Sequence, residues 1–337
     1  DRVDVAAEDR VREKWGVFVH RLTNTDKLPL KIGVVGKYSE LRDAYASIDK
    51  AIEHCGAHLG ADIEQCWLEA TDIQDSNAAE VLGQLDGVIV PGGFGTRGVE
   101  GKIAAVKYCR ESGQPYLGIC LGLQVAVIEF ARNVLRMEDA DSAEFSPDCP
   151  RPVISELPEQ KKIEGLGGTM RLGAQDVVIK GDTLAWQLFR ERLSASNTIR
   201  ERFRHRYEVD PTYIERLEAA GMVFSGRHPK APIMQIIELP LYLPAHMEQK
   251  GTSGTGNKPR PRVTHPYFIA TQFHPELTGR PTRPQPLFMG LIAAAMTKRY
   301  RADAKAWAKI NSEPLIKYWL LDHRADQDQD VVPENQP

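Results

Sequence analysis

The sequence predicts an α/β protein with a mainly parallel central sheet flanked by helices and a smaller antiparallel portion. Two observations lead to this prediction. Up to residue 132, short apolar runs typical of strands alternate with segments whose apolar residues have helical spacing. Beyond residue 168, short strand-like runs follow one another with few helices between them. Alternation of strand and helix indicates parallel strands covered on both faces.

In the first half, each strand is a short apolar run bounded by turn residues, and each helix follows from its apolar spacing. The run at 86–90 ends at Pro91-Gly92-Gly93, and the run at 115–119 leads directly into a helix. The predicted strands are 32–35, 86–90 and 115–119, and the predicted helices are 44–54, 103–110 and 125–132.

The second half is less regular and contains no internal repeat. Its helices are expected near the end of the chain, and its strands are short. The predicted strands are 169–172, 175–180, 222–226, 233–239 and 267–272, and the predicted helices are 213–220, 287–300 and 304–321.

Composition divides the chain into three parts. Residues 1–29 are charged with scattered apolar positions and predict a helical linker, and residues 30–300 predict the globular domain. Within that domain, the Pro-, Gly-, Lys- and Arg-rich stretch 241–264 predicts a flexible insertion. Residues 301–337 predict a helical extension and a polar tail. Because the chain starts at Asp1 without a Met, we expect it to be part of a longer protein.

Bulk composition narrows the class of protein. A formal charge of −3 gives no field for binding nucleic acid, and the apolar runs are far shorter than the roughly 20 residues of a membrane helix. The five cysteines are scattered and include no Cys-x-x-Cys pair, which argues against a disulfide framework and against a zinc site. We therefore expect a small-molecule enzyme of a reducing cytoplasm, without a metal.

Cys120 is the candidate nucleophile. It lies in Gly118-Ile119-Cys120-Leu121-Gly122, where an apolar strand runs into a helix, which is the layout of a nucleophile elbow with cysteine in place of serine. Glycines at 118 and 122 relieve the crowding of such a turn, and the helix N-terminus favours thiolate over thiol. The alternative is that Cys120 is a small core residue, as most lone cysteines are.

A thiolate nucleophile needs a base and a group that orients the base. His274 and Glu276, separated by Pro275, follow a predicted strand and project to the same side if the segment is extended. The carboxylate can then hold one imidazole nitrogen while the other faces Cys120. Taken alone, His274 would be a surface histidine beside a turn-forming proline.

An oxyanion hole completes the chemistry, because one lost donor typically lowers the rate by about 10²- to 10³-fold. The backbone N–H of Leu121 is one candidate donor. Gly93, in the turn Pro91-Gly92-Gly93-Phe94-Gly95 after a strand, is the other. Such a turn can also hold a nucleotide phosphate, yet it lacks the Gly-x-Gly-x-x-Gly pattern and the Lys-Ser/Thr of a P-loop.

Together these segments resemble the class I (triad) glutamine amidotransferases, which have a flavodoxin-like sheet, and within them the amidotransferase domains of the CTP synthase family. The resemblance covers roughly residues 31–300. The segments that carry it are 34–38, 43–45, 91–102, 118–124, 168–173, 204–208 and 272–276.

The resemblance implies a role for each matching residue. Cys120 would be the nucleophile, His274 the base and acid, and Glu276 its orienting partner, with Gly93 and Leu121 as oxyanion donors. It also implies that the α-amino and α-carboxylate groups of the substrate glutamine are bound by three further side chains, two of which would otherwise be read as solvated surface charges. These are Gln124, Glu144 and Arg206.

The segment 167–173 resembles the family's loop over the glutamine site, which responds to the allosteric activator GTP. Arg171 is then a candidate for contacting that nucleotide, and a structural ion pair is the alternative. The insertion at 241–264 and the extension beyond 301 are longer than the family leads us to expect, and neither touches a motif position.

The function implied is hydrolysis of L-glutamine to glutamate and ammonia through a cysteinyl thioester. This domain would need no cofactor. An N-terminal synthetase domain, absent from the chain, would use ATP, Mg²⁺ and the ammonia to convert UTP to CTP in a homotetramer. The alternatives are another triad amidotransferase, a γ-glutamyl hydrolase, or a catalytically silent regulatory module of the same fold.

Overall fold

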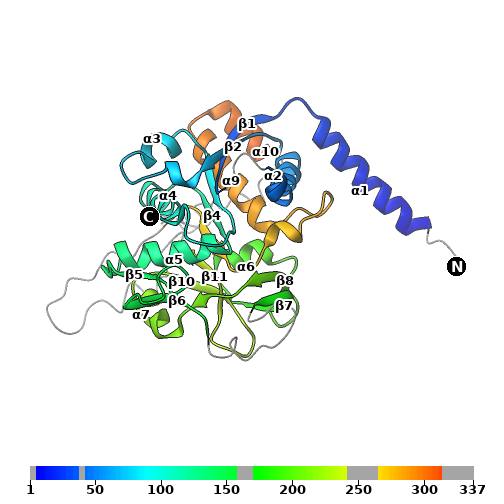
Figure 1. The fold of residues 1–337 in the computed structure, drawn as a ribbon. Helices are drawn as coiled ribbons and strands as arrows, with labels where there is room; N and C mark the ends of the chain where they lie inside the picture. The colour runs from blue at the N-terminus through cyan, green and yellow to red at the C-terminus, as the bar shows by residue number, and fades with distance from the viewer. Residues whose placement is uncertain (1–4, 38–41, 158–169, 241–264, 313–337) are drawn as a thin grey trace, which may run out of the picture.

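A nine-stranded mixed sheet forms the centre of the molecule in the computed structural model, which describes residues 5–37, 42–157, 170–240 and 265–312. The strand order is β2-β1-β3-β4-β12-β11-β10-β7-β8. Figure 1 shows the sheet with helices on both sides. The sheet divides into a parallel half, from β2 to β12, and an antiparallel half, from β12 to β8.

The first half is parallel. All its neighbouring strands run in the same direction. Every residue of β3 and β4 is buried, as expected of parallel strands covered on both faces. The strands are β2 (Ala61–Glu69), β1 (Leu28–Gly36), β3 (Gly87–Val90), β4 (Tyr116–Ile119) and β12 (Phe268–Thr271).

Two hydrophobic cores lie on opposite faces of this half. One packs α2 and α9 against the sheet, and the other packs α3, α4 and α5. The helices are α2 (Ala46–Leu59), α3 (Ala78–Leu82), α4 (Val99–Ser112), α5 (Leu121–Asn133) and α9 (Pro286–Tyr300). Short 3₁₀ turns η1 (Arg42–Tyr45) and η2 (Ala70–Asp72) join the early elements.

The second half of the sheet is antiparallel, from the β12–β11 pair to the edge strand β8. A three-stranded sheet in the order β5-β6-β9 lies beside it. The antiparallel strands are β11 (Met234–Leu239), β10 (Val223–Arg227), β7 (Arg171–Ile179) and β8 (Thr198–His205). The small sheet comprises β5 (Ala140–Ser142), β6 (Arg151–Ser155) and β9 (Glu208–Val209). The helical elements of this part are α6 (Leu184–Phe189), η4 (Pro211–Tyr213) and α7 (Ile214–Ala219).

The predicted fold class is confirmed, but the predicted elements are incomplete. Strands β2, β5, β6 and β9 and helices α3 and α6 were not predicted. The separate strands predicted at 169–172 and 175–180 are wrong for the described residues, since β7 runs unbroken from Arg171 to Ile179. Pairing with β8 along residues 171–178 carries the strand through Gly173 despite its positive φ of 85°. The edge strand β8 was not predicted, because its inward positions include the polar residues Glu201 and His205.

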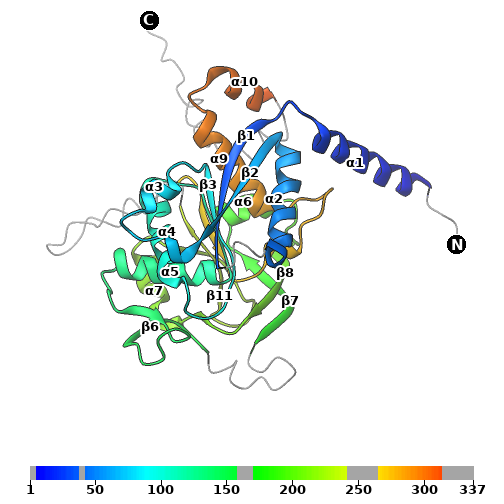
Figure 2. The same ribbon diagram turned by 45° about the horizontal axis from the view of Figure 1, so that its top comes forward.

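The N-terminal helix α1 (Val5–Thr23) forms as predicted and projects away from the sheet in both views (Figures 1 and 2). Strand β1 begins at Leu28, within the segment predicted as linker. Helix α10 (Ala304–Ser312) forms the start of the helix predicted at 304–321. The rest of that prediction and the insertion 241–264 lie outside the described residues, and the domain boundaries stay predictions. No helix in the described ranges has both the length and the apolarity needed to cross a bilayer.

Candidate active site

Cys120 lies on the sharp turn between β4 and α5. Its φ of 54° is in the left-handed region that side chains rarely adopt, so the backbone holds the residue in a strained conformation. A Cβ at Gly118 would lie 2.6 Å from Ala270 Cβ, and one at Gly122 would lie 2.1 Å from the carbonyl oxygen of Val90. Both glycines are therefore required by the close approach of β12 and β3. The structure shows the elbow that the flanking glycines predict.

His274 lies beside Cys120 because their strands are neighbours. Strand β12 pairs in parallel with β4, and both residues follow the carboxyl ends of these strands. The Nδ1 atom of His274 lies 2.7 Å from Oε1 of Glu276, and both side chains are buried. A Cβ at Gly92 would lie 3.0 Å from Cε1 of His274 and 3.4 Å from Cβ of Cys120. Glycine at 92 thus leaves room for the thiol and the imidazole to meet.

The charged form of His274 is favoured by its partners. Burial lowers the pKa of the imidazole, but the hydrogen bonds and charges of Cys120 and Glu276 outweigh it and raise that pKa to about 9. The imidazolium is therefore stable at neutral pH beside the sulfur of Cys120. This is the charge distribution that an activated cysteine needs.

The two predicted oxyanion donors lie together above the elbow. A Cβ at Gly93 would lie 3.5 Å from Cδ2 of Leu121, so the turn after β3 contacts the start of α5. Neither the Gly93 nor the Leu121 backbone N–H donates to an acceptor within the described part of the chain. Both N–H groups thus lack an internal acceptor among the described residues, as the donors of an oxyanion hole must.

A cavity of about 190 Å³ opens onto Cys120 and contains all three side chains predicted to bind the substrate. Gln124 donates from Nε2 to the carbonyl of Tyr207 at 3.0 Å, which leaves its Oε1 for a ligand donor. Glu144 and Arg206 bring opposite charges to the same small space. An amino acid with free α-amino and α-carboxylate groups matches this pair of charges.

Comparison with known proteins gives the family. A family model of glutamine amidotransferase class-I matches residues 40–246. The chain belongs to the class I glutamine amidotransferases. The matched range includes Cys120 but not His274 or Glu276, so the assignment of the base and its partner depends on geometry.

The relatives of this amidotransferase are CTP synthases, the family that the sequence motifs resemble. The chain is 44% identical over 298 residues to a CTP synthase of Halalkalibacterium halodurans, and the match covers 88% of this chain and 51% of the relative. It is 46% identical over 297 residues to a CTP synthase of Methanopyrus kandleri, covering 88% and 50%. The chain thus spans about half the length of the curated relatives it matches.

A solved structure supports the same placement. The glutaminase domain of Trypanosoma brucei CTPS, with bound acivicin, matches with a TM-score of 0.67 and 32% identity, covering 79% of this chain and 93% of that one. The amidotransferase fold predicted from the sequence is confirmed.

Two lysines contact the turn 91–95, which carries the predicted oxyanion donor Gly93, and neither was identified as a site residue from the sequence. Lys102 has no exposed surface and donates to the carbonyl of Pro91 at 3.0 Å. Lys37 donates to the carbonyls of Phe94 and Gly95 at 2.5 and 2.6 Å. Burial and the neighbouring Lys37 lower the pKa of Lys102 to about 7. The two lysine side chains thus bind backbone carbonyls on both sides of Gly93.

Two further polar side chains contact the reacting pair. Gln272 donates from Nε2 to Sγ of Cys120 at 3.7 Å. Nε of Arg204 lies 3.4 Å from Nε2 of His274 and can donate to it only when the imidazole is neutral. Their position in the motifs at 272–276 and 204–208 was the only signal in the sequence. Both side chains place positive dipole or charge near the thiol and imidazole.

Arg171 adopts the structural role that was its alternative. Its Nε lies 2.8 Å from Oε1 of Glu208, a carboxylate with no exposed surface that also lies 2.8 Å from Nε2 of His205. Arg171 lines neither the 190 Å³ cavity nor the adjoining cavity of about 460 Å³ that Cys120 shares with His274. Residues 167–169 of the predicted covering loop lie outside the described ranges, and nucleotide contact by Arg171 stays a prediction. Within the described ranges, His, Cys, Asp and Glu side chains form no group that could ligate a metal ion.

Proposed function

We propose that this chain hydrolyses L-glutamine to glutamate and ammonia through a thioester at Cys120. The observation that supports this most directly is the meeting of a strained elbow cysteine with the His274–Glu276 pair at a small cavity lined by Gln124 and Arg206.

In the first step, the Cys120 thiolate attacks the side-chain carbonyl carbon of glutamine. A C–S bond forms, and the carbonyl electron pair moves to the oxygen, whose charge the N–H groups of Gly93 and Leu121 stabilise. Collapse of this intermediate breaks the C–N bond. The leaving nitrogen takes a proton from Nε2 of His274 and departs as ammonia.

In the second step, neutral His274 takes a proton from water, whose oxygen attacks the thioester. The C–S bond breaks, glutamate is released, and the thiolate and imidazolium are restored. Glu276 holds the imidazole by Nδ1 through both steps and stabilises its charge. The overall balance is glutamine plus water to glutamate plus ammonia.

We further propose that the ammonia serves a synthetase part, absent from this chain, that uses ATP and Mg²⁺ to convert UTP to CTP. The CTP synthase relatives, of which the chain spans about half, support this. GTP activation, with Arg171 near the covering loop, and a homotetramer are proposed on the same family grounds. This amidotransferase part itself needs no cofactor. Five free cysteines, one of them the nucleophile, favour a reducing compartment such as the cytoplasm.

Covalent labelling tests the proposal without requiring a synthetase partner. The chain is incubated with acivicin, the compound bound by the trypanosomal domain, and the adduct is mapped by mass spectrometry. We expect one adduct, at Cys120, suppressed by excess L-glutamine. Ammonia release is measured in parallel, with and without GTP. Labelling elsewhere, or glutamine hydrolysis by a Cys120→Ala variant, would refute the mechanism.

A further inference from the structure

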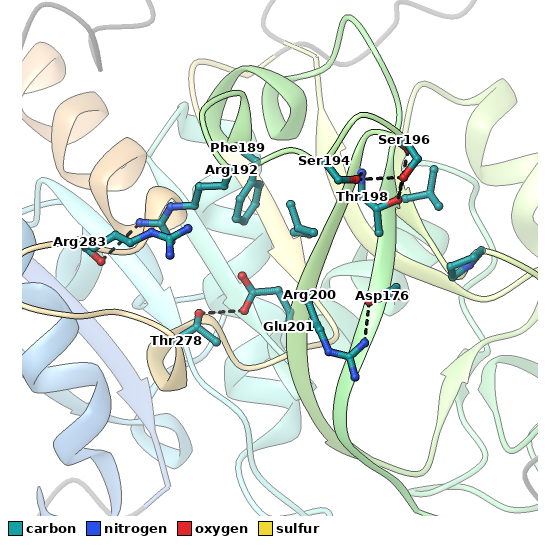
Figure 3. A pocket seen from close by; sticks show the side chains of 13 residues that line it. Asp176, Phe189, Arg192, Ser194, Ser196, Thr198, Arg200, Glu201, Thr278 and Arg283 are labelled. Carbon is teal, nitrogen blue, oxygen red and sulfur yellow. Dashed lines mark hydrogen bonds and ion pairs between the residues drawn. The ribbon is translucent and has the colours of Figure 1, made fainter. Parts of the chain in front are cut away.

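A further and larger cavity lies at the outer edge of β8, away from Cys120. Its volume is about 750 Å³, and it shares no lining residue with the cavities at the elbow. Its walls come from β7, the turn after α6, β8 and the segment 278–283 (Figure 3). A ligand here would not compete with glutamine for space.

Two arginines without carboxylate partners face this cavity. Among the described residues, neither Arg192 nor Arg283 has a carboxylate oxygen within salt-bridge distance, whereas Arg200 pairs with Asp176 at 2.8 Å. Arg192 donates to the backbone carbonyls of Arg283 and Pro284, and its guanidinium is close enough to that of Arg283 to be affected by its charge. Burial, followed by the charge of Arg283, lowers the pKa of Arg192 to about 10. The pair is therefore unfavourable by itself and would be stabilised by an anion.

The nearby acidic groups only partly offset this positive charge. Glu201 is 4% exposed, and burial raises its pKa to about 7, so its carboxyl group is only partly ionised at neutral pH. Its Oε2 accepts a hydrogen bond from Thr278 at 2.8 Å. Glu191 is exposed and acts on Arg192 through solvent. The cavity thus keeps a net positive charge.

Hydroxyl groups line the opposite wall. The side-chain oxygens of Ser194 and Ser196 lie 3.0 Å apart, and that of Thr198 lies 3.0 Å from Ser196. Figure 3 shows the two arginines on one side of the cavity and this chain of hydroxyls on the other. Guanidinium groups and hydroxyls are the side chains that bind phosphate oxygens most often, and a planar guanidinium does so with two parallel hydrogen bonds.

We propose that this cavity is a binding site for a small phosphorylated anion, with a phosphate group between the guanidinium groups of Arg192 and Arg283. The hydroxyls of Ser194 and Ser196 would contact the remainder of the ligand. The site is independent of glutamine hydrolysis and requires neither Cys120 nor a substrate.

Calorimetric titration of the full chain with inorganic phosphate, at constant pH and ionic strength, tests the site. We expect saturable binding by the wild-type chain, by a Cys120→Ala variant and by the control Arg200→Gln, which removes an arginine already paired. Arg192→Gln combined with Arg283→Gln should weaken binding at least tenfold. Absence of saturable binding to the wild type, or equal affinity in the double variant, would overturn the proposal.

Thermal unfolding of Arg283→Gln provides a second readout that does not depend on the double variant folding. Because its guanidinium repels that of Arg192, removing it should leave the unliganded Tm unchanged or raise it. Phosphate should increase the Tm of the wild type more than that of this variant. A lower unliganded Tm together with an undiminished phosphate shift would mean that Arg283 is structural and the proposal is wrong.

Discussion

His274 remains protonated further into the alkaline range than a free histidine, because Cys120 and Glu276 both stabilise its charged form. Its pKa lies above the ordinary value, so the ion pair contributes stability that is complete below pH 6.5 and is lost as the pH rises through about 9. Protonated His274 also donates the proton with which the nitrogen leaves as ammonia in the proposed reaction. Activity and part of the stability should therefore fall along the same alkaline limb.

Replacing Glu276 by Gln tests this coupling. The amide keeps the shape but removes the negative charge, so the pKa of His274 should fall. We expect kcat/KM to drop by about 10²- to 10⁴-fold and its alkaline limb to move to lower pH. A pH profile of ammonia release measures both quantities. An unmoved limb would show that Glu276 does not set the charge of His274.

Lys102 gives a second prediction for a single residue. Lys102→Met should remove the donor to the carbonyl of Pro91 and loosen the peptide that carries the Gly93 N–H. We expect kcat to fall about tenfold or more, with little change in KM, since the oxyanion forms only after glutamine binds. Steady-state kinetics separate the two constants. Lys107→Met, on the same helix but paired with Asp75, is the control. Equal effects of both variants would contradict the assigned role.

Among the elements, the elbow depends on how closely α5 approaches β3. The first turn of α5 passes so near that a Cβ at Gly122 would lie 2.1 Å from the carbonyl oxygen of Val90. Gly122→Ala should therefore shift the helix and reduce stability by about 1–3 kcal/mol, together with most of the activity. Denaturant unfolding and ammonia release measure the two effects. Gly181→Ala, where a Cβ has no neighbour within 4 Å, should leave both unchanged.

On the scale of the molecule, the 190 Å³ cavity at Cys120 is lined by residues from both halves of the sheet. Cys120 and Gln124 come from the parallel half, and Arg206 follows β8 in the antiparallel half. Because Arg206 is assigned to the substrate carboxylate, Arg206→Met should raise KM for glutamine by about 10- to 100-fold with a smaller change in kcat. Arg216→Met, on α7 and outside the cavity, is the control. Unchanged KM would remove Arg206 from the substrate site.

The parallel half of the fold was predictable because its strands are continuous apolar runs and its helices have regular spacing. Strand β2 was missed, since it lies at the edge and its residues are mostly half-buried. Strand β8 was missed because Glu201 and His205 face inward, where an apolar residue would have shown the alternation. Buried polar groups form hydrogen bonds and ion pairs with residues distant in the sequence, and a local sequence pattern does not identify those residues.

The sequence by itself determined the elbow, the candidate triad and the family, because glycine spacing, strand-to-helix junctions and short motifs are local properties of the chain. Only the tertiary structure decided that β12 pairs beside β4, which places His274 against Cys120 although 154 positions separate their numbers. It also revealed the lysines beneath Gly93, the ion pair of Arg171 and two arginines beside β8 that have no carboxylate partner among the described residues. These depend on burial and on charges brought together from separate segments, which no single stretch of sequence contains.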